Sequence, residues 1–127
     1  MIIRQIRTGI EARSMLEKLK TIYLEERFKD EQVTMTVGYI LNSAYDEVKD
    51  IDDWNSVINS NLYIEDEFIA KVKESKTQVI RFKLNDDTSK GIDTLTKKFS
   101  EELGLRAQIG FTAKQILKAA LLKRKNN

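Results

Sequence analysis

The sequence predicts a mainly α-helical protein that contains two short β-strands. It has no proline and only five glycines, and a third of its residues are charged. This composition suits helices joined by few tight turns. Apolar residues recur at helical spacing along most of the chain, whereas two short segments have the character of strands. At 127 residues we expect a single domain, 1–127, with one shared core.

The first predicted strand covers residues 2–8, which are rich in β-branched side chains. Thr8 is then spaced to open a capping box at the start of a helix. Apolar side chains recur every three or four positions from there to about Arg27, as on one face of a helix. After a charged turn, Thr34 or Thr36 is placed to cap a second helix.

The second predicted strand, 79–84, alternates in character along its length. Ile80, Phe82 and Leu84 would share one face. Asn85 is a suitable cap for the helix that follows, and Gly104 is placed to end it in a left-handed conformation. A capping box that begins at Thr112 is expected to open the last helix.

The two halves of the chain resemble each other. When 6–45 is aligned with 82–121, an offset of 76 positions without a gap, eight residues are identical and the apolar positions coincide. The identical pairs include Leu19 with Leu95 and Thr36 with Thr112. We therefore expect two strand-helix-helix repeats, 2–48 and 77–127. An acidic helical connector, 49–76, would join them, with Trp54 as its packing anchor.

Charge is unevenly distributed along the chain. Residues 46–67 hold eight acidic side chains against one lysine, so the remaining 21 basic and 12 acidic residues carry a net charge of +9. A basic body of this kind is typical of proteins that bind polyanions.

The chain has neither cysteine nor histidine, which excludes disulfides, thiol and imidazole catalysis, and zinc sites built from those ligands. Acidic pairs such as Glu25 and Glu26 are neighbours in sequence, and neighbours on a helix point about 100° apart. They would not converge on a reacting atom. We expect no enzyme activity, no cofactor and no metal site.

A strand followed by two helices within about forty residues, found twice, resembles the ribbon-helix-helix family of DNA-binding proteins, which includes Arc and MetJ. The resemblance covers residues 2–48 and 78–125. It implies that the two strands pair as a short two-stranded antiparallel ribbon that enters the major groove. The fold would then be a tandem ribbon-helix-helix pseudo-dimer within one chain. The implied function is double-stranded DNA binding, as a transcriptional regulator or as a plasmid or phage DNA-organising factor.

With Ile80, Phe82 and Leu84 against the helices, the outer face of the ribbon would be free to read bases. Arginine and lysine can donate to guanine, and glutamine can pair with adenine. Arg4 would then lie on the inner face, a defect that a one-residue slip or a frayed first strand would explain. The predicted base contacts are Gln5, Arg7, Arg81 and Lys83.

The resemblance also implies that the amino end of the second helix in each repeat contacts a backbone phosphate. The positions that match by the 76-residue offset, with the next lysine one turn further along, are Thr36, Val37, Gly38, Thr112, Ala113, Lys114 and Lys118.

Two alternative functions remain open. One is a role like that of DndE, the accessory protein of DNA phosphorothioation systems, on nicked or distorted DNA. The other is a protein-interaction or assembly module, with the acidic connector as its binding segment. Oligomers on DNA are also open. No signal peptide or membrane span is evident, so we expect a cytoplasmic protein without membrane contact.

Overall fold

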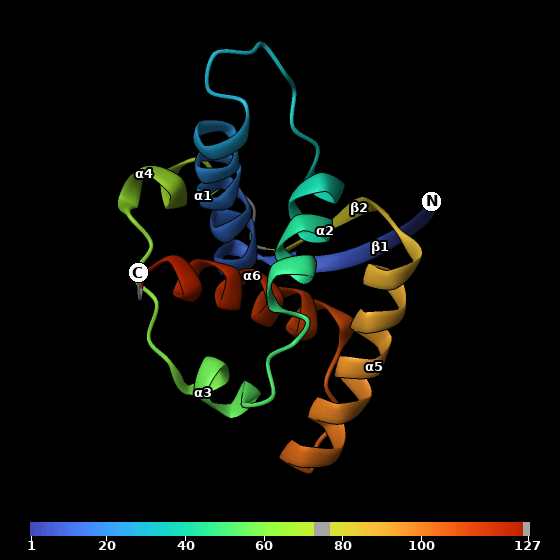
Figure 1. Cartoon of the computed structure of the whole chain (residues 1–127). Coiled ribbons are helices and arrows are strands. Elements are labelled where there is room, and N and C mark those ends of the chain that lie inside the picture. The colour runs from blue at the N-terminus through green and yellow to red at the C-terminus, as the bar shows by residue number, and fades with distance from the viewer. Residues whose placement is uncertain (73–76, 126–127) are drawn as a thin grey trace.

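The computed structural model describes residues 1–72 and 77–125, and Figure 1 shows the order of its elements. Helices predominate, and a two-stranded antiparallel sheet accompanies them, as the sequence predicts. Residues 73–76 of the predicted connector and 126–127 of the second repeat lie outside the described residues. The elements are β1 (Ile2–Gly9), α1 (Ile10–Arg27), α2 (Val37–Val48), α3 (Trp54–Asn59), α4 (Asp66–Ala70), β2 (Thr77–Leu84), α5 (Asp86–Leu103) and α6 (Ile109–Lys125).

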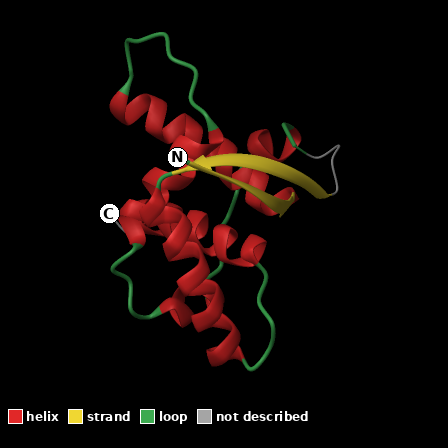
Figure 2. Cartoon of the chain, turned by 90° about the vertical axis from the view of Figure 1, so that its right-hand side faces the viewer, coloured by secondary structure: helices red, strands yellow, loops and turns green. Residues whose placement is uncertain are grey.

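The two strands form one antiparallel ribbon, drawn in yellow in Figure 2. Its inner face is mainly apolar, with Ile6, Phe82 and Leu84 each at most 1% exposed. This confirms the predicted facing of the second strand. A lone ribbon is marginal in water, and burial of this face against helices stabilises it.

Arg4 lies on the inner face, directly opposite Phe82. Its guanidinium reaches α5, where it donates to Ser89 Oγ at 2.9 Å and pairs with Asp93 Oδ1 at 3.0 Å. The expected slip or fraying of the first strand is therefore wrong. The register holds because a long side chain places its charge beside polar partners at the edge of the core.

Three of the predicted helix ends are confirmed. Thr36 caps α2, since its hydroxyl accepts from Tyr39 N at 3.2 Å. Asn85 caps α5, and Gly104 ends that helix with φ of 67°. The capping box at Thr8 is wrong, because Thr8 faces inward from the strand and donates across the ribbon to Gln78 O at 2.9 Å.

The last helix begins earlier than predicted. α6 starts at Ile109, and Thr112 is fully buried within it, hydrogen-bonded to Thr96 at 2.6 Å. The first residues of α2 and α6, Val37 and Ile109, are thus 72 positions apart, while α1 and α5 start 76 positions apart. The ungapped alignment is therefore wrong by four residues in the second helix. A four-residue slip is close to one helical turn, so it leaves the apolar stripe nearly unchanged.

When the second helices are aligned at an offset of 72, the two strand-helix-helix units share contacts as well as the order of their elements. In the first unit, Tyr23 of α1 meets Tyr39 of α2 edge to face, with centroids 6.5 Å apart. In the second, Phe99 of α5 meets Phe111 of α6 in the same way at 5.7 Å. The units also interlock, because α2 packs on β2 and α6 packs on β1.

The connector adds two short helices to this core. Trp54 of α3 is 2% exposed and packs edge to face on Phe99 at 5.6 Å, which confirms its predicted role as a packing anchor. In Figure 1, α3 lies below α6 and α4 lies beside α1. None of the helices in the described part of the chain is long and apolar enough to cross a membrane.

Candidate nucleic-acid interface

The outer face of the ribbon is exposed along its length. The register places three cross-strand pairs on it: Ile3 opposite Lys83, Gln5 opposite Arg81, and Arg7 opposite Val79. All six side chains are exposed, and they alternate with the buried residues of the inner face. Because successive side chains of a strand point to opposite faces, the helices that bury the inner face leave these six pointing outward.

Within residues 1–72 and 77–125, no hydrogen bond or ion pair holds the side chains of Gln5, Arg7, Arg81 or Lys83. Some other cations of the protein are paired within it. Arg124 is one, paired with Glu47 at 2.7 Å and with Glu26 at 3.0 Å. The ribbon therefore presents three cations and one amide that are free to bind another molecule. All four residues predicted for base contact lie together on this face.

The two second helices abut the ribbon at equivalent points. A Cβ added to Gly38 would lie 2.4 Å from the carbonyl oxygen of Lys83, and one added to Gly110 would lie 2.4 Å from that of Arg7. Each glycine is the second residue of its helix. Amides of the first turn have no partner within a helix, and they carry its positive dipole end. Both helix starts therefore bring such amides to the edges of the ribbon.

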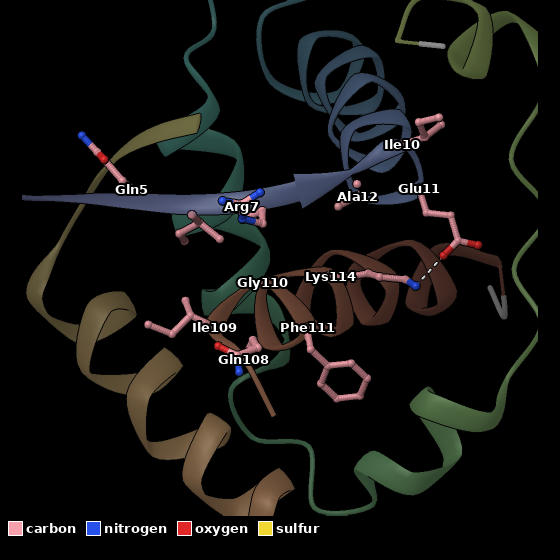
Figure 3. A pocket seen from close by; sticks show the side chains of 12 residues that line it. Gln5, Arg7, Ile10, Glu11, Ala12, Gln108, Ile109, Gly110, Phe111 and Lys114 are labelled. Carbon is pink, nitrogen blue, oxygen red and sulfur yellow. Dashed lines mark ion pairs between the residues drawn. The ribbon is translucent and has the colours of Figure 1, made fainter. Parts of the chain in front are cut away.

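The residues predicted for phosphate contact are only partly available. At α2, Thr36 is exposed and Val37 half-buried, while Gly38 is buried against the ribbon. At α6, Lys114 is half-buried and paired with Glu11, as Figure 3 shows.

Three of the predicted phosphate contacts are wrong, because Thr112, Ala113 and Lys118 are buried and lie beyond the start of α6. Lys118 extends toward α3 and donates to Ile58 O at 3.0 Å. Burial lowers the pKa of Lys118, and the neighbouring charge of Lys114 adds to the effect. The four-residue error in the alignment had placed Thr112 and Ala113 at the start of the helix.

The residues that occupy the start of α6 are Gln108, Ile109 and Gly110, which the sequence reasoning missed. A signal for them exists in the chain. Val37-Gly38-Tyr39 and Ile109-Gly110-Phe111 match in residue type at all three positions, and aligning them requires the four-residue gap. Gln108, Ile109 and Gly110 line a groove of about 880 Å³ together with Arg7 and Lys114. Figure 3 shows the side chains around this groove.

Comparisons with family models, with curated proteins and with solved structures gave no match. Membership of the ribbon-helix-helix family therefore stays a prediction from the sequence pattern.

Several acidic side chains of residues 46–67 are engaged within the protein. Glu47 pairs with Arg124 and Arg27, and Glu65 pairs with Lys18 at 2.8 Å. Asp53 caps α3. A protein partner for the acidic connector stays a prediction. Across the described ranges, no three acidic side chains are grouped so that they could hold a metal ion.

Proposed function

We propose that the protein binds double-stranded DNA and reads the major groove with the outer face of the β1–β2 ribbon. The roles that fit this activity are transcriptional regulation and the organisation of plasmid or phage DNA. The observation that carries the proposal is the set of four exposed side chains, Gln5, Arg7, Arg81 and Lys83, which share one face and have no partner in the described residues.

The shape of the ribbon supports the proposal. The major groove is about 12 Å wide and admits a two-stranded ribbon. Base edges there present acceptors on guanine and a donor with an acceptor on adenine, which arginine, lysine and glutamine can pair with.

The surroundings of the ribbon give a second line of support. The two helix starts at Gly38 and Gly110 flank it and would offer backbone amides to a phosphate on either side. The repeated contacts at the two glycines and in the two aromatic pairs also support the proposal, because two copies related by a half-turn would make such contacts. We therefore interpret the chain as a pseudo-dimer of two ribbon-helix-helix units.

Fluorescence anisotropy with labelled duplex DNA tests the proposal. The double substitution Arg81→Ala and Lys83→Ala removes two of the ribbon cations, and we expect affinity to fall at least about tenfold. The matched control is Lys97→Ala with Lys125→Ala, which removes the same charge about 16 and 24 Å from the starts of α5 and α6. Equal losses in both variants would contradict readout by the ribbon.

Salt and DNA form separate the proposal from the alternatives. Binding through several phosphate contacts predicts that log affinity falls steeply as log salt rises. Intact duplex should bind better than single strands. A preference for nicked over intact duplex would instead favour a DndE-like accessory role. Absence of binding to any DNA at low salt would favour a protein-interaction module.

A further inference from the structure

The centre of the ribbon differs chemically from its two ends. The exposed cross-strand pairs lie in the order Ile3 with Lys83, Gln5 with Arg81, and Arg7 with Val79. The outer two pairs each join an aliphatic β-branched residue to a cation. The central pair joins an amide to a cation. The two outer pairs of the ribbon therefore have the same side-chain types, whereas the two residues of the central pair differ in type.

A half-turn about the central pair makes this relation explicit. Gln5 and Arg81 are 76 positions apart, the offset between α1 and α5, and they face each other directly. Such a rotation would exchange Ile3 with Val79 and Arg7 with Lys83. Ile3 and Val79 have the same exposed fraction, 49%. The exchanged residues of the flanks are of the same type, whereas at the centre a glutamine is exchanged with an arginine.

The contacts between the helices and the ribbon follow the same half-turn. Gly38 touches the backbone of Lys83 and Gly110 that of Arg7, and a half-turn exchanges these two contacts as well. The two helix starts therefore contact equivalent positions on the two strands. Phosphate contacts made by the backbone amides of those starts would be related by the same half-turn, so we look for the asymmetry of DNA recognition in the side chains at the centre of the ribbon.

On the basis of the proposed DNA-binding function, we infer that the preferred DNA site is an inverted repeat with an asymmetric centre. In the flanks, Ile3 and Val79 contact thymine methyl groups, while Arg7 and Lys83 donate to guanine. At the centre, Gln5 pairs with adenine in one half-site and Arg81 pairs with guanine in the other.

A consequence of this arrangement is that the protein binds its site in one orientation. A homodimer of identical units presents the same residue twice at the axis, so its preferred site is symmetric. Here both strands belong to one chain, so the two central positions can differ. The wrong base at either central position should cost about 5- to 150-fold in affinity.

Selection of binding sites from a randomised duplex library tests the inference. The wild type should yield flanks in inverted repeat around an A·T pair on one side of the centre and a G·C pair on the other. Arg81→Gln should make the centre A·T on both sides, and Gln5→Arg should make it G·C on both sides, with unchanged flanks. Both side chains are exposed, so a circular dichroism melt should match that of the wild type.

A control variant leaves the ribbon intact. Lys97→Ala together with Lys125→Ala removes two exposed cations of α5 and α6, and it should leave the selected site and its asymmetric centre unchanged. A fully palindromic wild-type site, or an altered flank in Arg81→Gln, would overturn the inference while leaving DNA binding intact. Failure of the wild type to bind any duplex would overturn the proposed function as well.

Discussion

Gly38→Ala tests the close contact between the second helix and the ribbon. An added Cβ would lie 2.4 Å from the carbonyl oxygen of Lys83 and 3.0 Å from its nitrogen. Both are backbone atoms of β2, so neither can rotate away. Ordinary contact begins at about 3.4 Å, so α2 and β2 would have to separate by about 1 Å.

The magnitude follows from two opposing effects. Alanine favours a helix over glycine by up to about 1 kcal/mol. Forcing a methyl group into a packed site costs about 1–3 kcal/mol, and more where only the backbone can move. The second effect should prevail, so we expect Gly38→Ala to lower Tm by roughly 3–15 °C. Gly110→Ala should behave alike, because its Cβ would lie 2.4 Å from the carbonyl oxygen of Arg7.

The assay is thermal unfolding followed by circular dichroism, with Gly9→Ala as the matched control. A Cβ at Gly9 meets nothing within 4 Å, and its φ of −90° suits alanine. That variant should melt within a few degrees of the wild-type Tm, because the lower entropy of its unfolded chain opposes the loss of a favourable N-cap residue of α1. If Gly38→Ala melted like the wild type, or if Gly9→Ala lost as much stability, the helix would not be pressed against the ribbon as described.

Two further substitutions separate stability from binding. Burial raises the pKa of Glu47, but hydrogen bonds from Arg124 and Tyr23 outweigh burial and hold this pKa below 4.5. A lowered pKa in the folded state contributes stability that is complete above 4.5 and lost as pH falls through the folded value. Urea unfolding should therefore show Glu47→Gln less stable than the wild type at neutral pH, with a gap that closes in acid; a gap independent of pH would contradict this. Lys118→Met should leave DNA affinity unchanged in the anisotropy assay, because Lys118 is buried against Ile58; a loss like that of Arg81→Ala with Lys83→Ala would return Lys118 to the interface.

The facing of the ribbon could be predicted from the sequence because strands alternate with a period of two. Ile80, Phe82 and Leu84 alternate with Val79, Arg81 and Lys83, and only one register buries the apolar set. Arg4 broke this pattern in the first strand. Its partners Ser89 and Asp93 lie some 85–89 residues away, so local reasoning could not supply them.

The start of α6 could not be fixed in the same way. A helix repeats every 3.6 residues, so a shift of four leaves the apolar stripe in nearly the same direction. The apolar pattern alone therefore could not distinguish an offset of 76 from one of 72. Gly38 and Gly110 distinguish the two offsets, because each lies so close to a strand carbonyl oxygen that a side chain would not fit. That requirement became evident only when the strands and helices were placed together.

Chemical-shift mapping by NMR tests the central claim most directly. Duplex DNA is added at low salt to the ¹⁵N-labelled protein, and the backbone amides that shift are assigned. DNA held by the ribbon should move the amides of residues 3–7 and 79–83, together with those at the starts of α2 and α6. Shifts confined to α3, α4 or the far end of α5, with the ribbon amides unmoved, would contradict the account.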